Sequence, residues 1–402
     1  MGLIIQKYGG TSVGTLDRIR SVAENIEATL AQGHQLVVVV SAMGQQTDEL
    51  LKMAQMLCDH PDSREVDMLL TAGERVSMAL LAIALQDRGV KSLSLTGSQS
   101  GILTDEVHGN ARIERISGER IRTILSGGSV AIVAGFQGVC PRSKEVTTLG
   151  RGGSDLTAIA LAASLGAQRC QVFKDVDGVC TADPRLVANA LPISQLSLGS
   201  MSRLAWQGAA VLHARAVHVA AKYSVPIEIR SSFNLAARGT IVMDHNEKLE
   251  HPRVDGIAHK ERMAAAELSI AKQGGSIGLG RVVTDFLWTK GESPLVFAEF
   301  SDASHCSIHL IVSQENLEQL RAKLIEGPIT EIGRPEISAR PVATISIIGQ
   351  GFNQAPELVF KIREILGEVV VFFQVQNEQI TAAVAPAELK PTAEKLHRFL
   401  FE

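Results

Sequence analysis

Short apolar runs alternate with longer amphipathic segments through the first half of the chain. Leu3–Gln6, Leu36–Val40 and Val130–Ala134 are apolar or nearly so, a pattern typical of strands buried on both faces. Between the first two, Leu16–Leu30 has apolar residues three or four positions apart, which predicts a helix. Strands that alternate with helices in this way predict a layered α/β domain with a largely parallel central sheet.

The rest of the first half continues this alternation. Further periodic segments predict helices, and further short apolar runs predict strands. The predicted helices are Met68–Leu85, Asp155–Leu165 and Met201–Lys222, and the predicted strands are Ser92–Leu95, Gln171–Phe173 and Ile227–Arg230.

The pattern changes after this domain. Residues 245–253 are polar and include a proline, which indicates a linker. Beyond it, strands and helices follow in the order β-α-β-β-α twice, which is typical of ferredoxin-like units. We therefore expect an α/β domain at residues 1–244 and two ferredoxin-like units at residues 254–338 and 339–402.

The second of these units ends in a helix, so it lacks a final strand. Val254–His259 could supply that strand by folding back, because an open sheet edge favours pairing. The first strand of each unit is predicted at Ala264–Ile270 and at Val342–Ile348.

Charge and composition exclude several classes of function. The net charge of -4 gives no field that would attract nucleic acid or an anionic membrane. No apolar run approaches the ~20 residues of a membrane span, and the N-terminus lacks an export signal, so we expect a cytoplasmic protein. The five cysteines form no CxxC pair and have no histidine at metal-ligand spacing, which favours structural thiols.

A glycine-bearing turn follows the first predicted strand. Gly9 and Gly10 let the main chain approach an anion, and N–H groups at a helix start favour negative charge. Lys7 adds a positive charge beside them. The segment is not a GxxxxGK[ST] loop. Taken alone, it also fits a plain strand-to-helix turn.

Two more polar segments come next. Ser41 follows a buried strand, where open α/β sheets bind ligands, so Ser41 and Thr47 could donate hydrogen bonds to a small polar substrate. Thr47 could instead cap a helix. Glu74 and Arg75 interrupt an apolar helix and point in different directions, so one of them should face a cleft. A carboxylate there could hold an ammonium group, unless both lie on a solvated face.

The segment Thr147–Asp155 contains three glycines, an arginine and an acidic helix start. The guanidinium of Arg151 matches a carboxylate in bidentate geometry, and Gly153 permits close contact of a ligand with the main chain. The carboxylates of Asp175–Arg185 could frame a nucleotide and its magnesium. That stretch could equally form an Asp-Gly turn and a loop closed by proline.

Seven segments of the first half stand out together. They are KYGGTSVG, VVVVSAMG with Thr47, MLLTAGERVS, GSQSGILTDEVHGNARI, VAGFQG, TTLGRGGSDLTA and DVDGVCTADPR. They occur in the order found in aspartate kinases, and the chain resembles that family over nearly all of residues 3–243. The combination separates it from the acetylglutamate, carbamate and uridylate kinases that share the amino acid kinase fold. The second half resembles, more loosely, the paired regulatory ACT domains of the family.

The resemblance implies a role for each matching residue. Lys7 would stabilise charge on the transferred phosphoryl group, and Asp155 would lie beside its path. The residues implied to bind aspartate are Ser41, Thr47, Glu74, Arg151 and Gly153. The residues implied to bind ATP are Lys7, Gly9, Gly10, Lys174, Asp175, Cys180, Asp183 and Arg185.

The resemblance further implies ATP and Mg²⁺ as cofactors and L-aspartate as the substrate. The product would be 4-phospho-L-aspartate, and the reaction would be the first step toward lysine, methionine and threonine. A carboxylate is already ionised at pH 7, so the reaction needs no protein nucleophile or base. We expect catalysis by positioning and charge neutralisation, with the metal held mainly by phosphates and water.

Three departures from the family pattern lie on the expected nucleotide side. Cys180 stands in place of the usual Tyr, Lys174 in place of Ser or Thr, and Ala210 in place of Lys. We hypothesise that Lys174 supplies the charge that Ala210 lacks. The alternative is that Lys174 is a solvated surface lysine.

The ACT-like half departs further. Lys272–Ser276 lacks the proline and the acidic residue of the family turn, while Asn353 and Gln354 could contact an effector or simply begin a helix. Lysine or threonine as an effector is a family expectation. We also expect the tandem units to join chains into a homo-oligomer.

Two other functions stay open at this point. The chain could be another amino acid kinase with a different acyl acceptor, although GRGGSD together with Glu74 and Thr47 favours aspartate. It could also be a non-catalytic chain that binds an amino acid and regulates a partner. Retention of Lys7, Arg151 and Asp155 argues against that second possibility.

Overall fold

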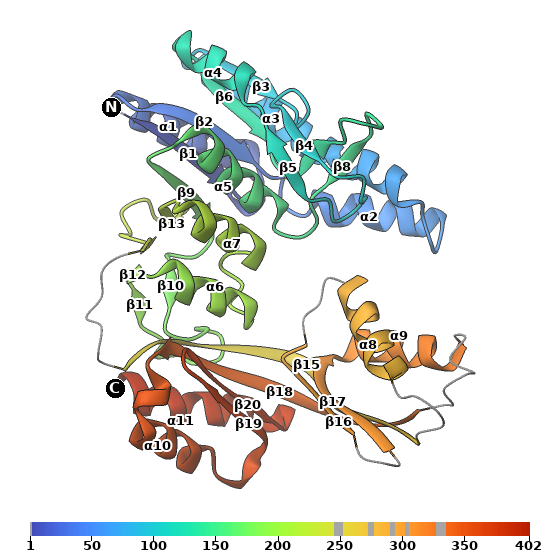
Figure 1. The fold of residues 1–402 in the computed structure, drawn as a ribbon. Helices are drawn as coiled ribbons and strands as arrows, with labels where there is room; N and C mark the ends of the chain where they lie inside the picture. Colours follow the sequence, from blue (N-terminus) through green and yellow to red (C-terminus); the bar gives the residue numbers. More distant parts are fainter. Residues whose placement is uncertain (1, 245–251, 272–276, 290–293, 302–304, 327–334) are drawn as a thin grey trace. The chain divides into compact units, whose positions relative to one another are not determined.

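The chain forms two compact units (Figure 1). The first comprises Met1–Thr181 with Ala190–Leu249, and the second comprises Ala182–Asn189 with Glu250–Glu402. Residues 245–251 of the predicted linker lie outside the described residues, and Arg253 already begins a strand. The computed structural model describes residues 2–244, 252–271, 277–289, 294–301, 305–326 and 335–402.

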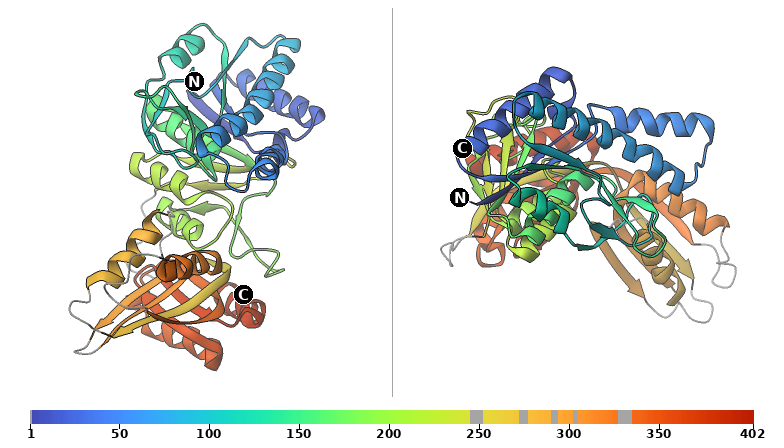
Figure 2. Two further views of the ribbon diagram at one scale, coloured as in Figure 1. Left: turned by 90° about the vertical axis from the view of Figure 1, so that its right-hand side faces the viewer. Right: turned by 90° about the horizontal axis from the view of Figure 1, so that it is seen from above.

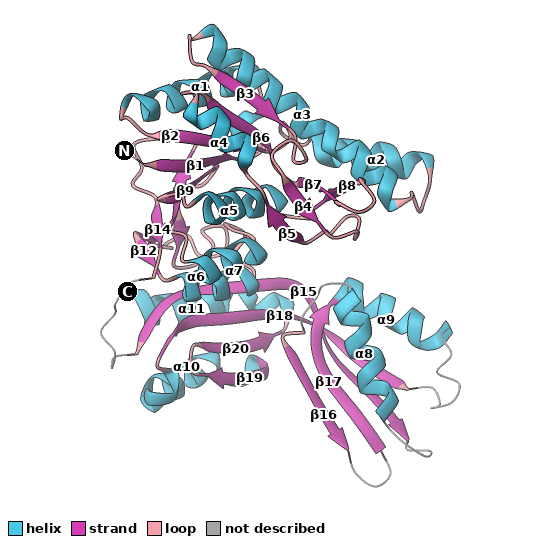
Figure 3. Cartoon of the chain, turned by 45° about the horizontal axis from the view of Figure 1, so that its top comes forward, coloured by secondary structure: helices cyan, strands magenta, loops and turns pink. Residues whose placement is uncertain are grey.

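An eight-stranded sheet forms the centre of the first unit (Figure 3). Its strands are β1 (Leu3–Tyr8), β2 (Gln35–Val40), β3 (Ser92–Leu95), β6 (Val130–Ala134), β9 (Arg169–Lys174), β12 (Gln195–Leu196), β13 (Ile227–Ser231) and β14 (Thr240–Val242). They lie in the order β12-β14-β13-β9-β1-β2-β6-β3, and every neighbouring pair is parallel except β13 with β14. The predicted largely parallel sheet is confirmed.

Helices cover both faces of this sheet (Figures 1 and 3). Ile4 and Val38 pack in one buried cluster with Ile26 and Leu81, which belong to two of these helices. Successive side chains of a strand point to opposite faces, so Lys7 points away from this cluster toward α5. The helices are α1 (Leu16–Ala31), α2 (Gln46–Leu57), α3 (Ser63–Asp87), α4 (Glu119–Ser126), α5 (Gly153–Leu165), α6 (Leu198–Trp206) and α7 (Ala214–Tyr223).

Among the helices in the described ranges, α3 alone is long and apolar enough to cross a membrane by length and composition. Half of its most apolar window is buried. Leu81 and Leu85 of α3 belong to the buried cluster beneath the sheet, which is the packing of a core helix.

The single long helix predicted at Met201–Lys222 is wrong, because the chain forms α6 and α7 there with a turn between them. Gly208 adopts φ 112°, which glycine tolerates readily and which takes the chain out of the helical conformation. The N–H of Ala209 closes this turn by donating to the Leu204 carbonyl at 2.8 Å. His213 then precedes α7 in an extended conformation.

Two smaller sheets lie in the same unit. β10 pairs with β11, and the other sheet has the order β5-β4-β7-β8. The strands are β4 (Ile102–Thr104), β5 (Ile113–Ile116), β7 (Gln137–Val139), β8 (Val146–Thr148), β10 (Val179–Cys180) and β11 (Pro192–Ile193).

The second unit contains one six-stranded antiparallel sheet. Its strands are β15 (Arg253–Ala271), β16 (Val296–Ser301), β17 (His305–Ser313), β18 (Glu336–Gln350), β19 (Val370–Gln376) and β20 (Gln379–Val384). Its helices are α8 (Ile277–Thr289), α9 (Gln314–Glu326), α10 (Pro356–Leu366) and α11 (Leu389–Phe401). The strand order is β16-β17-β15-β18-β20-β19.

The central strands β15 and β18 are longer than the predicted Ala264–Ile270 and Val342–Ile348, because each serves both ferredoxin-like units (Figures 2 and 3). The first half of β15 pairs with the second half of β18, with Val254 opposite Gly349 and His259 opposite Ile345. The predicted exchange of the strand Val254–His259 is therefore confirmed. It completes the second unit in the strand order of a ferredoxin-like fold.

The first ferredoxin-like unit is completed in the same way by residues 336–342 of β18. The change from one unit to the other falls at a register shift between Lys260 and Met263, where Arg262 adopts φ 54°. Such a bulge bends a strand, and here it marks the point where β15 passes from one ferredoxin-like unit to the other within the same sheet.

Candidate active site

The turn after β1 is closely packed at the carboxyl ends of three strands. The Gly9 N–H donates to the Phe173 carbonyl of β9 at 3.3 Å, and the Gly44 N–H after β2 donates to the Gly10 carbonyl at 3.0 Å. A Cβ on Gly10 would lie 2.9 Å from the Gly44 carbonyl oxygen. Any side chain at Gly10 would therefore push these loops apart, and the glycine is a steric requirement.

Lys7, Asp155 and Lys174 form a buried charged trio at this edge. Lys7 Nζ lies 2.7 Å from Asp155 Oδ1, and Lys174 Nζ lies 2.8 Å from Asp155 Oδ2. The side chains are 6%, 4% and 19% exposed, in the order Lys7, Asp155 and Lys174. The trio therefore carries one excess positive charge in a setting of low dielectric constant, which favours an anionic ligand.

The strand register explains how the trio forms. Lys7 of β1 is paired with Val172 of β9, so Lys174 projects from the same face two residues further along. Asp155 lies in the first turn of α5, above that face. Lys174 is thus no solvated surface lysine, and that interpretation is wrong.

Burial and mutual attraction set the charges of the trio. Burial lowers the pKa of Lys7, although Asp155 acts in the opposite direction. Burial by itself would raise the pKa of Asp155, but Lys7 and Lys174 hold that pKa well below its usual range. Asp155 therefore stays ionised at neutral pH and is unsuited to accept a proton.

Glu74 is a buried carboxylate with one oxygen still available. Its side chain extends from α3 to the segment after β2, where Oε1 accepts a hydrogen bond from the Ala42 N–H at 3.1 Å. Oε2 is buried and has no partner among the described residues. Burial raises the pKa of Glu74 to about 7. An ammonium group that reached Oε2 would satisfy it and restore the ionised state.

Two predicted substrate residues lie near Glu74. The Ser41 carbonyl accepts a hydrogen bond from Ser77 Oγ at 2.7 Å, three residues beyond Glu74 on the same helix. Thr47 lies in the first turn of α2 and is half-buried. Arg75, in contrast, is exposed, so Glu74 is the member of that pair that faces inward.

The Arg151 turn connects β8 to α5. Gly150 and Gly152 adopt φ values of 75° and 69°, in the left-handed region that favours glycine. Arg151 between them is exposed. A Cβ on Gly153 would lie 2.9 Å from Leu149 Cβ, so the start of α5 also requires a glycine.

Of the other predicted nucleotide residues, Asp175 and Cys180 belong to the first compact unit. Asp175 is exposed and Cys180 is half-buried. Asp183 and Arg185 belong to the second compact unit, where Arg185 Nη2 lies 2.7 Å from Asp183 Oδ2. The hydrogen bonds from Arg185 lower the pKa of Asp183.

Three residues of the site region were missed by the motif analysis. Asp67 is fully buried and accepts hydrogen bonds from the Gly109 N–H at 3.1 Å and the Thr148 N–H at 3.1 Å. The signal available in the sequence was its spacing from Glu74, because two carboxylates seven residues apart lie on the same side of one apolar helix. The others, His213 and Arg215, lie in the family-like run that contains Ala210, but that run assigned them no role, because their contacts lie far away in the sequence.

No metal centre is built from side chains in the described ranges, which hold no group of three or more His, Cys, Asp or Glu residues suited to an ion.

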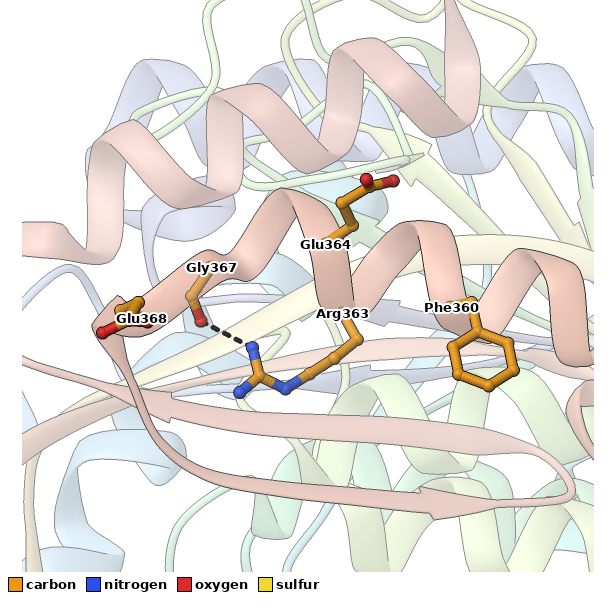
Figure 4. A pocket seen from close by; sticks show the side chains of 5 residues that line it. All are labelled: Phe360, Arg363, Glu364, Gly367 and Glu368. Carbon is orange, nitrogen blue, oxygen red and sulfur yellow. Dashed lines mark hydrogen bonds between the residues drawn. The ribbon is translucent and has the colours of Figure 1, made fainter.

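A shallow pocket on α10 of the second unit is lined by side chains of one helix and its end (Figure 4). Arg363 there donates to the Gly367 carbonyl. Phe352–Gln354, with exposed Asn353 and Gln354, forms a short 3-10 turn before that helix. The predicted turn Lys272–Ser276 lies outside the described residues.

Comparison with known proteins agrees with these observations. Residues 2–231 match the Amino acid kinase family. An aspartokinase of Geobacillus stearothermophilus is 40% identical over 406 residues, covering 99% of this chain and 97% of the relative. Aspartokinase 2 of Bacillus subtilis is 38% identical over 403 residues, with the same coverage of both chains.

Solved structures show the same fold. Aspartokinase III of E. coli, in complex with aspartate and ADP, matches the whole chain with a TM-score of 0.81 at 22% identity, and all of that chain is covered. An aspartate kinase from Synechocystis is 33% identical, with a TM-score of 0.56 over 99% of this chain and 69% of its own. By sequence and by fold, the chain belongs to the amino acid kinase family and, within it, to the aspartokinases.

Proposed function

We propose that this chain transfers the γ-phosphoryl group of Mg·ATP to the side-chain carboxylate of L-aspartate. The observation that carries the proposal is a pair of complementary sites at one edge of the sheet. Lys7, Asp155 and Lys174 carry an excess positive charge, and Glu74 has a buried oxygen without a partner among the described residues. A phosphate suits the first site and an ammonium group suits the second.

Each predicted residue then has a physical task. Lys7 stabilises charge on the transferred phosphoryl group, and the Gly9–Gly10 turn lets the main chain approach the phosphates. Glu74 binds the ammonium group of aspartate, and Arg151 binds its α-carboxylate. The remaining residues that line the aspartate site are Ser41, Thr47 and Gly153, and those that border the nucleotide are Lys174, Asp175, Cys180, Asp183 and Arg185.

The chemistry requires positioning more than proton transfer. The substrate carboxylate is ionised at pH 7 and attacks without a base. Asp155 orients Lys7 and Lys174 while it remains ionised itself. Mg²⁺ would be held chiefly by the phosphates of the nucleotide and by water, and its charge would support the same in-line transfer.

The first experiment is ADP release from Mg·ATP with and without L-aspartate, with the acyl phosphate trapped as a hydroxamate. Lys7→Met serves as the blank because it removes the charge but keeps most of the volume. We expect aspartate-dependent turnover that falls by about 10²–10³-fold in the blank. ATP binding without turnover in the unaltered protein would favour the regulatory, non-catalytic function instead.

We infer in addition that the second unit joins chains into a homo-oligomer. A groove on its sheet is lined by Phe300, His309, Arg340 and Phe372, and Phe300 is 58% exposed. Apolar surface of this kind favours association with a second copy. Light scattering after size-exclusion chromatography tests this with Phe300→Glu, which should shift the protein toward monomer.

The same preparation can be titrated with lysine and threonine to test an amino-acid effector.

A further inference from the structure

Arg215 makes an unusual set of hydrogen bonds close to the Arg151 turn. It lies in the first turn of α7 and is half-buried. Nη1 donates to Asn110 Oδ1 at 2.6 Å and to the Leu149 carbonyl at 2.7 Å, and Nη2 donates to the Ala111 carbonyl at 2.8 Å. One guanidinium thus holds two segments that are far apart in the sequence. All three acceptors are neutral.

The two segments that Arg215 joins are already in contact. The Ala111 N–H donates to the Thr148 carbonyl at 2.8 Å, at the end of β8. A Cβ on Gly150 would lie 3.0 Å from the Gly109 carbonyl oxygen. The main chain that leads into the Arg151 turn therefore packs directly on the 109–111 loop.

Asp67 holds the same two segments from another helix. Its carboxylate accepts from the Gly109 N–H in the loop and from the Thr148 N–H at the end of β8. It also lies 2.7 Å from the ring of His108. The start of the turn is thus fixed by α3 through Asp67 and by α7 through Arg215.

The far side of the turn rests on α7 as well. A Cβ on Gly152 would lie 2.2 Å from His213 Cβ, so the main chain at Gly152 is in direct contact with the residue that precedes α7. His213 and Arg215 are two residues apart. The beginning of α7 therefore contacts both ends of the three-residue turn that carries Arg151.

We propose that Arg215 is a positioning residue for the substrate α-carboxylate. By holding the Leu149 carbonyl it fixes the main chain one residue before Gly150, and so fixes the direction in which exposed Arg151 extends. A guanidinium binds a carboxylate in a narrow bidentate geometry, so a small displacement of its main chain weakens binding. The inference rests on the proposed function, because it assumes that Arg151 binds aspartate.

Arg122 offers a matched control. It donates from Nη1 to the Ser117 carbonyl at 3.0 Å and from Nη2 to the Ser164 carbonyl at 3.0 Å. These contacts also join two segments far apart in the sequence, but they involve none of the residues of the proposed site. Arg122→Ala should therefore leave both KM values unchanged.

The test is steady-state kinetics of Arg215→Ala, Arg215→Lys and Arg122→Ala. For Arg215→Ala we expect KM for aspartate to rise by about 10- to 100-fold, while KM for ATP changes by less than about threefold. Arg215→Lys should recover only part of the loss, because an ammonium group cannot reproduce the planar fork. Equal increases in both KM values, or none, would overturn the proposal.

Asn110→Ala gives a second variant in case Arg215→Ala fails to fold. Asn110 is exposed, and its removal deletes one acceptor of Arg215 without opening a buried space. A rise of about threefold in KM for aspartate alone is expected. No selective rise in this variant would contradict the positioning role.

Hydrogen exchange distinguishes a failure of this positioning role from a failure of the proposed function. Amides of residues 149–153 should exchange faster in Arg215→Ala than in the unaltered protein or in Arg122→Ala. If the unaltered protein shows no aspartate-dependent turnover, the proposed function fails, and exchange alone decides whether Arg215 holds the turn. Unchanged exchange at these residues would refute that role.

Discussion

The two units treat buried charge in opposite ways. The first buries Lys7, Asp155 and Glu74 near the ends of parallel strands and Asp67 beside β8, whereas the buried acidic and basic residues described in the second are Asp255 and His397. Asp255 is paired with Arg253 of its own strand at 2.6 Å. Burying charge is costly, so a cluster of buried charges favours a binding site in the first unit, and the described residues of the second unit contain no such cluster.

The largest effect is expected for Asp155→Asn, which tests whether the first unit depends on its buried charges. It leaves two buried ammonium groups without a counter-charge, so the free energy of unfolding should fall by about 3–5 kcal/mol and turnover should be lost. Denaturant unfolding measures the first effect. The matched variant Asp155→Asn/Lys174→Met removes one uncompensated charge and should recover part of the stability but no activity. Full stability of the single variant would contradict the buried trio.

Glu74→Gln separates binding from stability. KM for aspartate should rise by about 10- to 100-fold, because the neutral amide lacks the charge that attracts an ammonium group. The folded pKa of about 7 lies above the unfolded value, so protonated Glu74 favours the folded state at low pH and this advantage disappears as pH rises through about 7. Unfolding at pH 4 should be similar for both proteins, whereas at pH 8 the variant should be more stable by about 3 kcal/mol.

The same ionisation should appear in substrate binding. In the unaltered protein, aspartate affinity should rise as pH increases through about 7, because only ionised Glu74 attracts the ammonium group. Glu74→Gln should lose this dependence. An affinity that falls over this pH range in the unaltered protein would contradict the assignment of Glu74.

Lys174→Ala tests whether the second lysine of the trio contributes to ATP binding. If Lys174 replaces the charge missing at Ala210, KM for ATP should rise by about tenfold or more while KM for aspartate changes little. Asp155 keeps Lys7 as a partner, so the loss of stability should be smaller than for Asp155→Asn. An unchanged KM for ATP would limit Lys174 to holding Asp155.

The smallest effect is expected for Arg262→Gly, which tests the stability of the second unit. Arg262 adopts φ 54° at the register shift of β15, a conformation that glycine adopts without strain. The second unit should gain up to about 1 kcal/mol of stability, and turnover should be unaffected. A matched Lys260→Gly change, outside the left-handed region, should be destabilising instead.

Much of the architecture follows from local spacing. The parallel sheet, the two ferredoxin-like units and the exchange of Val254–His259 were predictable because helical and strand periods are properties of neighbouring residues. The break between α6 and α7 was not, since the apolar spacing continues across Gly208 and only its positive φ interrupts the helix. The full length of β15 and β18 also depends on partners supplied by distant segments.

The sequence alone predicted which polar segments belong to the proposed site, and tertiary structure decided which of their charges meet. Lys7 and Lys174 are far apart in the chain, and the register between β1 and β9 brings both onto Asp155. Asp67 and Arg215 hold the Arg151 turn through contacts that no local pattern encodes. Periodicity reports the environment of each residue, but an ion pair or a main-chain hydrogen bond depends on two positions that only folding brings together.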